Sequence, residues 1–196
     1  MFPITSLQYW IFDMDGTLTV PLHNFEKIRL QLGVPAGMDI ISFMEKQTET
    51  EARETKKKLE DIELWYAERA EIQPDLIPFL EQLLTRGCRL GVITRNNRKH
   101  TDITMEKTGL MRYFDTILTR EFEPAKPHPA SVEYFLTKWN APQDTTVMIG
   151  DYVHDIEAGR AAGVHTIYFD SRKDCAWNSL AERTAHSWGE LLEELP

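Results

Sequence analysis

The stretch LQYWIFDMDGTLT at residues 7–19 decides the predicted fold. It opens on an almost continuous apolar run, which is typical of a strand buried on both faces of a parallel sheet. Asp13 and Asp15 follow this run, and Gly16 permits a tight turn in which backbone N–H groups approach an anion. Two carboxylates spaced in this way can face one pocket. A surface turn is the other interpretation, because Asp and Gly are favoured in turns.

Further apolar runs continue the pattern along the chain. They are RLGVIT, TILTR, TVMIGD and HTIYFD, at residues 89–94, 116–120, 146–151 and 165–170. Helical patterns separate the runs, and the helix before the first of them can be capped by Asp75 and ended by Gly87. Strands that alternate with helices predict an α/β fold, a Rossmann-like doubly wound parallel sheet. In such sheets ligands bind at the carboxyl ends of the strands.

The segment at residues 20–74 interrupts this alternation, because it carries only helical signals. Three helices are expected there, from signals at Asn24 with Gly33, at Asp39, and at Thr48 with Glu51. We therefore predict a small all-helical subdomain inserted into an α/β core, which residues 1–19 and 75–196 form together.

The composition is that of an ordinary globular protein, with 42% hydrophobic and 27% charged residues among 196. The formal net charge of −9 disfavours a nucleic-acid or membrane partner, because an acidic surface repels phosphate backbones and anionic lipids. It leaves a small phosphate ester possible, since a metal ion and a few cations can make one pocket locally positive.

The remaining global features indicate a cytoplasmic location. Cys88 and Cys175 form no CxxC pair and no disulfide framework. The first residues lack both a basic leader and a long apolar run, and no stretch is long and apolar enough to span a bilayer. A monomer is favoured, although nothing in the sequence specifies the oligomeric state.

Polar residues stand near other strand ends. Thr94 closes the second predicted strand, where its hydroxyl can hold a phosphate oxygen or simply cap a helix. Lys126 lies in EPAKPHPAS, where the flanking prolines can aim it inward, although a lysine in such a turn is usually solvated. In GDYVHD, Asp151 ends a strand and Asp155 follows one helical turn later. Carboxylates from two strand ends suit Mg²⁺, but the pattern also fits a helix N-terminus that favours an acid.

Taken in order, DMDGT, Thr94, Lys126 and GDYVHD resemble the four motifs of the haloacid dehalogenase superfamily of phosphohydrolases. The resemblance covers residues 7–19 and 75–170, and the helical insertion lies where one branch of that family carries its cap. KPHP is similar to the third motif of the phosphoglycolate-phosphatase-like branch. The resemblance thus implies the α/β core of this superfamily, a cap at residues 20–74, and a small phosphorylated metabolite as partner.

The resemblance also implies catalytic roles. Asp13 would attack phosphorus and form an aspartyl-phosphate. Asp15 would protonate the leaving oxygen and then activate the water that hydrolyses the intermediate. Lys126 and Thr94 would bind the transferring phosphoryl oxygens, and Lys126 would also offset the negative charge of the carboxylates. Cations and positioning are needed because an anionic nucleophile must approach an anionic ester.

A magnesium site is implied by the same motifs. The ligands would be the Asp13 carboxylate, the Asp15 backbone carbonyl and the Asp151 carboxylate. Asp155 would orient these ligands without binding the ion itself.

One position departs from the family pattern. Many relatives place Asn directly after the second-motif Thr, whereas here Arg95 stands between Thr94 and Asn96. Arg95 is either a further phosphate-binding residue or a salt-bridged surface group. His154 in the fourth motif is expected to be a helix surface residue and not a metal ligand.

The sequence therefore favours a magnesium-dependent phosphatase that hydrolyses small phosphate monoesters. A phosphomutase of the same fold and a non-catalytic phospho-ligand-binding or regulatory protein are the alternatives. A dehalogenase is disfavoured, because it needs no acid at the position of Asp15. Phosphoglycolate is the substrate that the resemblance suggests, while sugar phosphates and nucleotides are comparably plausible.

Overall fold

The computed structural model describes residues 2–22, 25–36, 38 and 40–196. Within them, six strands form one sheet in the order β3-β2-β1-β4-β5-β6. The strands are β1 (Tyr9–Phe12), β2 (Arg89–Ile93), β3 (Thr116–Leu118), β4 (Thr146–Gly150), β5 (His165–Phe169) and β6 (Arg183–Ala185). Every neighbouring pair is parallel. The predicted Rossmann-like α/β fold is confirmed.

Strand β1 lies in the middle of this sheet and sets the register of its neighbours. Phe12 is paired with Val92 of β2 on one side and with Ile149 of β4 on the other. The carboxyl ends of these three strands therefore meet at one edge. The residues that follow them in the chain are brought to the same place.

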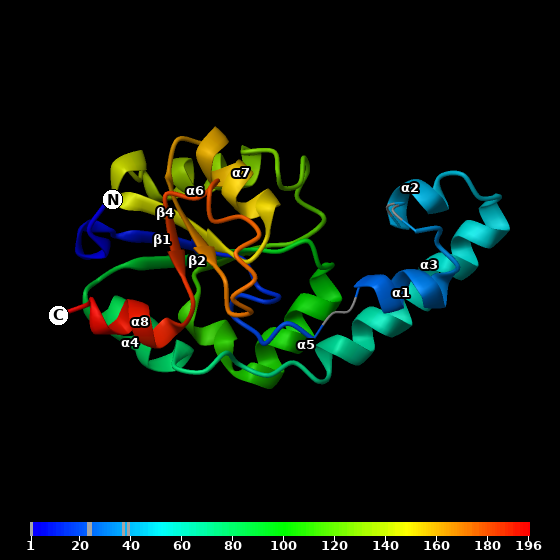
Figure 1. Ribbon diagram of the computed structural model, residues 1–196, viewed down its shortest axis with the longest axis horizontal. Coiled ribbons are helices and arrows are strands. Elements are labelled where there is room, and N and C mark those ends of the chain that lie inside the picture. The colour runs from blue at the N-terminus through cyan, green and yellow to red at the C-terminus, as the bar shows by residue number, and fades with distance from the viewer. Residues whose placement is uncertain (1, 23–24, 37, 39) are drawn as a thin grey trace.

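The helices outside the insertion cover both faces of the sheet (Figure 1). They are α4 (Leu76–Thr85), α5 (Arg98–Thr108), α6 (Ala130–Trp139), α7 (Val153–Ala161) and α8 (Trp188–Glu193), with short 3-10 turns at Ile4–Ser6, Leu110–Tyr113 and Gln143–Thr145. Trp10 of β1 packs with Phe79 and Trp188 on one face, while its neighbour Ile11 packs with Phe135 on the other. Adjacent strand residues point to opposite faces, so an apolar run buries both.

Two details differ from expectation. The short strand β6, which pairs with β5, was not predicted, because Arg183 and Thr184 break the apolar pattern that marked the other strands. Asp75 precedes α4 but makes no capping hydrogen bond with its side chain. Its φ of 60° is left-handed, whereas a side-chain N-cap usually needs extended backbone. Gly87 does follow the helix end, with a φ of 76°.

The inserted segment contains α1 (Phe25–Leu32), α2 (Ile40–Met44) and α3 (Glu49–Ala67). The predicted capping box is present, because Thr48 N donates to Glu51 Oε2 at 2.9 Å and Glu51 N donates to Thr48 Oγ1 at 3.4 Å. Asn24 and Asp39, the other two expected start signals, lie outside the described residues.

The three helices pack on a small apolar cluster of their own, which includes Ile28, Leu32 and Val34 with Leu59, Ile62 and Tyr66. They extend to one side of the sheet (Figure 1). The two chain crossings to the core run side by side. Thr19 forms an antiparallel bridge with Ile72, and Val20 N donates to Glu71 O at 2.9 Å.

The cysteines and the lengths of the helices can be compared with expectation. Cys88 is buried and Cys175 is exposed, and both are free thiols, as expected. Among the helices of the described residues, none combines the length and the apolar character needed to cross a bilayer.

Candidate active site

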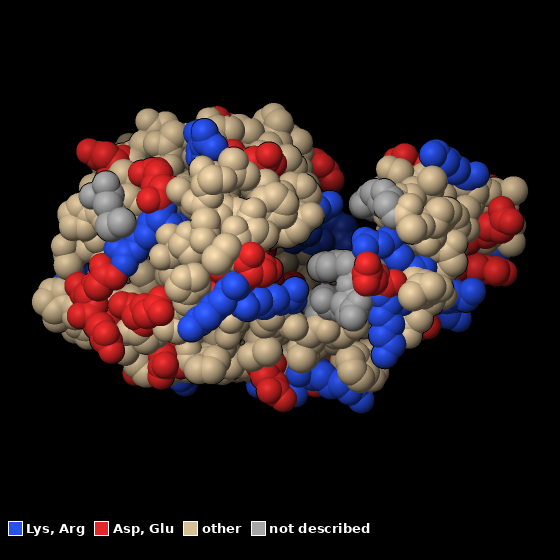
Figure 2. Space-filling model, in the orientation of Figure 1, with Lys and Arg blue, Asp and Glu red and all other residues tan. Residues whose placement is uncertain are grey.

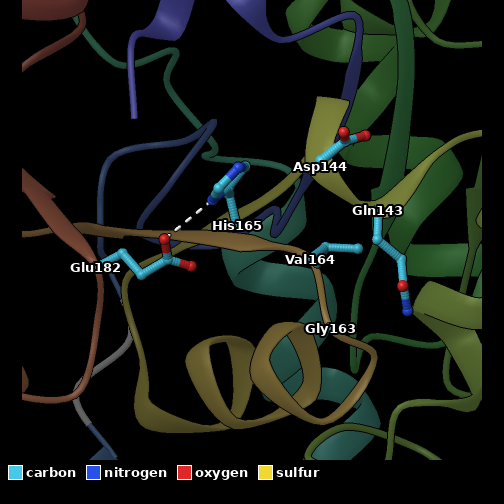
Figure 3. A pocket seen from close by; sticks show the side chains of 6 residues that line it. All are labelled: Gln143, Asp144, Gly163, Val164, His165 and Glu182. Carbon is cyan, nitrogen blue, oxygen red and sulfur yellow. Dashed lines mark hydrogen bonds and ion pairs between the residues drawn. The ribbon is translucent and has the colours of Figure 1, made fainter. Parts of the chain in front are cut away.

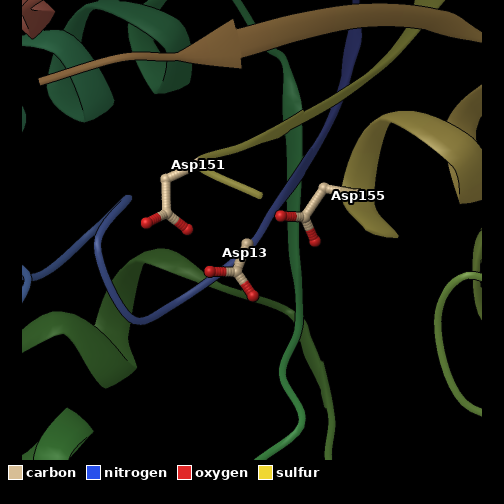
Figure 4. A group of neighbouring side chains, drawn as sticks. All are labelled: Asp13, Asp151 and Asp155. Atoms are coloured by element: carbon tan, nitrogen blue, oxygen red, sulfur yellow. The ribbon is translucent and has the colours of Figure 1, made fainter. Parts of the chain in front are cut away.

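Three carboxylates converge at the carboxyl edge of the sheet. Asp13 follows β1, Asp151 follows β4, and Asp155 lies in the first turn of α7. One oxygen from each lies within 4.8 Å of the others, and Figure 4 shows the three groups around one point. Such a cluster of oxygen donors suits a hard divalent cation.

Two glycines make this convergence possible. Gly16 has a φ of +88°, and a Cβ there would lie 2.1 Å from Asp151 Oδ2. A Cβ at Gly150 would lie 2.3 Å from Asp155 Oδ2. Any other residue at either position would displace a carboxylate of the cluster.

Lys126 is turned inward, with only 4% of its surface exposed. Its Nζ donates to Asp13 Oδ1 at 2.7 Å, to Asp155 Oδ1 at 2.6 Å and to the Ile93 carbonyl oxygen at 2.8 Å. All three ammonium donors are thus used. Burial alone would lower the pKa of Lys126, but Asp13 and Asp155 outweigh it and raise that pKa above its ordinary value. The ammonium stays charged.

Burial also raises the pKa of the carboxyl groups. The pKa of Asp13 rises to about 7, with Lys126 opposing the effect of burial and Asp155 adding to it. Burial raises the pKa of Asp15 to about 7, against the opposing Lys126. Burial and the neighbouring Asp13 raise the pKa of Asp151 to about 8. The site therefore holds carboxyl groups that exchange protons near neutral pH.

Asn96 holds Asp15, a contact that the sequence did not indicate. Asn96 Nδ2 donates to Asp15 Oδ2 at 2.7 Å, and Asn96 N donates to Thr94 Oγ1 at 3.1 Å. Asn96 stands one position later than the family pattern places its Asn, yet its side chain contacts Asp15. Its place two residues after Thr94 was the signal that could have found it.

Thr94 and Lys126 line a small cavity of about 10 Å³, which is roughly the size of one water molecule. Thr94 is buried, with 3% of its surface exposed. Ser131 also lines the cavity, and its hydroxyl is buried without a partner among the described residues. The structure thus brings the second- and third-motif residues together.

Arg95 is exposed and points to the fourth motif. Its Nη1 lies 3.0 Å from Nδ1 of His154. Burial and the nearby guanidinium lower the pKa of His154 below its usual value. Among the described residues no carboxylate lies within ion-pair distance of Arg95. The salt-bridged surface role considered for it is not what these contacts show.

A polar link joins the inserted helices to this edge, again without a signal in the sequence. Glu63 of α3 accepts a hydrogen bond from Arg120 Nη2 at 2.8 Å and lies 3.2 Å from His100 Nδ1. Arg120 in turn donates from its backbone N to Asn96 O and from Nε to Arg95 O, at 2.8 and 2.9 Å. Helix α3 is therefore connected to the loop that carries Asn96.

A hollow of about 450 Å³ lies elsewhere and is lined by Gln143, Asp144, Gly163, Val164, His165 and Glu182 (Figure 3). These residues precede or begin β4 and β5, apart from Glu182, which precedes β6. The hollow is therefore at the amino edge of the sheet, opposite the carboxylates. His165 Nδ1 lies 2.9 Å from Glu182 Oε2 there.

Comparison with known proteins agrees with this geometry. Residues 10–169 match the family model described as haloacid dehalogenase-like hydrolase. The chain is 29% identical over 178 residues to a haloacid dehalogenase-like hydrolase domain-containing protein of Arabidopsis thaliana, covering 85% of this chain and 72% of that protein. It is 31% identical over 162 residues to an uncharacterized hydrolase of Saccharomyces cerevisiae, covering 80% and 74%.

A solved structure shares the fold. The crystal structure of a predicted phosphoglycolate phosphatase from Haemophilus somnus superposes with a TM-score of 0.77 at 21% identity, over 96% of this chain and 98% of that one. The family match runs from Trp10 in β1 to the end of β5, and so includes five of the six strands and all the motif residues. This chain belongs to the haloacid dehalogenase-like hydrolase family.

Proposed function

We propose that the chain is a magnesium-dependent phosphatase that hydrolyses small phosphate monoesters, with Asp13 as its nucleophile. The observation that carries this proposal is the contact of 2.7 Å between Lys126 Nζ and Asp13 Oδ1, at the carboxyl end of the central strand. A fixed cation beside the nucleophile lowers the repulsion between a carboxylate and an incoming phosphoryl group. The description of the Haemophilus somnus protein as a predicted phosphoglycolate phosphatase is consistent with a small phosphate ester as the substrate class.

Asp13 acts as the nucleophile, and Asp15 acts as the general acid and then as the general base. An Asp13 oxygen forms a bond to phosphorus while the bond from phosphorus to the leaving oxygen breaks, and the Asp15 proton passes to that oxygen. The resulting Asp15 carboxylate then takes a proton from water, whose oxygen attacks the aspartyl-phosphate and releases phosphate and free Asp13. A pKa near 7 suits Asp15 to both steps.

The donor set fits Mg²⁺ at this edge. The Asp13 and Asp151 carboxylates and the Asp15 backbone carbonyl would hold it, since hard oxygens are its preferred ligands. When bound, the ion would neutralise charge on the phosphoryl oxygens. Asp155 is engaged elsewhere, because its Oδ1 accepts from Lys126 and its Oδ2 from Tyr152 N at 3.1 Å. These bonds support an orienting role for Asp155.

The remaining roles follow from position. Lys126 and Thr94, which line one cavity, would bind the phosphoryl oxygens, with Lys126 exchanging one of its three present contacts for a phosphoryl oxygen. Residues 20–74 would form a cap on a core made of residues 1–19 and 75–196, because the inserted helices have their own apolar cluster and two adjacent crossings. Such a cap would select substrates and shield the site from water.

The test is turnover of 4-nitrophenyl phosphate by wild type and by Asp13→Asn, with Mg²⁺ and with EDTA. Asp13→Asn should lose at least about 10³-fold in kcat, because an amide cannot act as the nucleophile. Asp144→Asn, at the far edge of the sheet, is the matched control and should keep wild-type activity. Retention of more than about a tenth of the activity by Asp13→Asn would refute the assignment, since covalent catalysis leaves no such remainder.

The alternatives predict other results. A phosphomutase would transfer the phosphoryl group to a second hydroxyl compound faster than to water. A phospho-ligand-binding protein would show no turnover with Mg²⁺ present.

A further inference from the structure

Arg95 and His154 form a basic pair beside the carboxylate cluster. Arg95 follows β2 by two residues, and His154 lies in the first turn of α7, one residue before Asp155. Their side chains meet at 3.0 Å, from Arg95 Nη1 to His154 Nδ1. The pair therefore joins the second and fourth motifs beside the carboxylates of the proposed active site.

The chemistry of the two groups fixes which atoms remain for a ligand. A guanidinium carries only donors and stays protonated, so His154 Nδ1 must accept and its N–H is at Nε2. Within the part of the chain that is described, no carboxylate shares the charge of Arg95. Arg120, which contacts the same loop, is instead paired with Glu63 at 2.8 Å. Arg120 is thus structural, whereas Arg95 keeps donors for another anion.

The position of the pair separates it from the transferring phosphoryl group. Lys126 and Thr94, proposed to bind that group, have exposed fractions of 4% and 3%. Arg95 is exposed, and its side chain is directed to His154. Figure 2 shows Lys and Arg side chains in the hollow between the core and the inserted helices. In a chain of net charge −9, exposed basic side chains next to the carboxylate cluster attract an anion.

Aromatic rings hold the imidazole in place. The Tyr152 ring contacts the His154 ring edge-on, with centroids 5.0 Å apart. The centroid of the Tyr152 ring also lies 5.8 Å from that of the Trp177 ring. A side chain fixed in this way loses little freedom when a ligand binds.

We propose that Arg95 and His154 bind a second anionic group, a carboxylate or a phosphate, on the leaving-group side of the phosphate ester. The proposal rests on the phosphatase function proposed above and names its substrate class: esters whose leaving group carries its own negative charge. Charge-assisted hydrogen bonds from a guanidinium are the interactions that select such groups.

The experiment compares matched esters that differ in this charge. Phosphoglycolate is paired with 2-hydroxyethyl phosphate, 3-phosphoglycerate with glycerol 3-phosphate, and propane-1,3-diyl bisphosphate with 3-hydroxypropyl phosphate. The wild type should prefer the charged member of at least one pair by about tenfold or more in kcat/KM, the usual size of a charge-assisted hydrogen bond. The pair that shows the preference tells a carboxylate ligand from a phosphate ligand.

Variants then assign the preference to Arg95. Arg95→Gln should abolish it, mainly by raising KM for the charged ester more than for its neutral partner. Arg95→Lys should restore part of it, because the charge returns without the planar fork. Arg98→Gln is the matched control, since Arg98 is an exposed arginine on α5 already paired with Asp102.

The outcomes separate the two proposals. Hydrolysis of the esters with the same charge preference in wild type and Arg95→Gln would overturn the anion site and leave the phosphatase intact. Absence of hydrolysis of every ester, 4-nitrophenyl phosphate included, would overturn both.

Discussion

The side-chain amide of Asn96 donates a hydrogen bond of 2.7 Å to Oδ2 of Asp15. Asp15 is half-buried, and this bond holds the direction in which its carboxyl group presents a proton. The backbone of Asn96 accepts from Arg120, whose guanidinium is bound to Glu63 of α3. The proposed general acid is thereby connected to the inserted helices through two side chains.

Asn96→Ala should slow the reaction without weakening substrate binding. The substitution removes one of the contacts that orient the Asp15 carboxyl, and we expect kcat to fall about tenfold or more with KM within about twofold. Steady-state kinetics at several pH values measure both parameters. Because a donor favours the ionised carboxylate, the kcat profile that depends on Asp15 should also shift to higher pH. Asn178→Ala, at an exposed asparagine, should change neither, and a normal kcat for Asn96→Ala would contradict the role.

The raised pKa values make the stability of the metal-free protein depend on pH. In the unfolded chain Asp13, Asp15 and Asp151 titrate near their ordinary value of 3.8, whereas burial raises the folded values to about 7, 7 and 8. Between about pH 4 and pH 8 the folded protein therefore binds more protons than the unfolded chain. Its free energy of unfolding should fall as pH rises through this window. The stability that these three carboxyl groups contribute is fully present only below the window.

Thermal unfolding in EDTA at pH 5, 6, 7 and 8 measures this dependence. Asp151→Asn should flatten it, because one of the three groups no longer titrates, whereas Asp144→Asn should not. Added Mg²⁺ should raise Tm more at pH 8 than at pH 5, since it binds the ionised carboxylates. A Tm that responds equally to Mg²⁺ in wild type and Asp151→Asn would argue against the proposed ligand set.

Gly16→Ala should weaken metal binding, and Gly33→Ala supplies a matched comparison. Both glycines have left-handed backbone, with φ of +88° and +70°, so both variants should lose about 1 kcal/mol of stability or more. Only at Gly16 would the new Cβ strike Asp151 Oδ2, while nothing lies within 4 Å of a Cβ at Gly33. Calorimetric titration with Mg²⁺ should therefore show weaker binding for Gly16→Ala alone. Equal affinities in the two variants would exclude Asp151 as a ligand.

Glu63→Gln should alter substrate choice more than metal binding. The substitution removes the charge that holds Arg120 and weakens the connection between α3 and the loop of Asn96. We expect relative kcat/KM values among phosphate esters to change severalfold, by the loss of one charge-assisted contact. Mg²⁺ affinity should stay the same, because every proposed ligand lies outside the inserted helices. Glu60→Gln, at an exposed position of the same helix, is the control. A collapse of metal affinity with unchanged preference would refute the division between core and cap.

The sequence alone determined five of the six strands and the place of the acidic motifs. The runs before Asp13 and Asp151 are short and apolar, as buried strands are, and parallel pairing brings both acids to one edge. The capping box of Thr48 and Glu51 was equally readable, because both partners lie within one turn. Local features of this kind depend only on residues that are close in the sequence. The sequence did not predict strand β6, because this strand is defined by its pairing with β5 and not by an apolar pattern of its own.

Only the tertiary structure decided how the site is supported. The bonds of Asn96 to Asp15, of Arg120 to Glu63 and of Arg95 to His154 join residues that are 81, 57 and 59 positions apart. The inward turn of Lys126 likewise depends on carboxylates at Asp13 and Asp155, because a buried ammonium is stable only where such partners meet it. These contacts form when strands and helices from distant parts of the chain pack, and no local pattern specifies which side chains will then face one another.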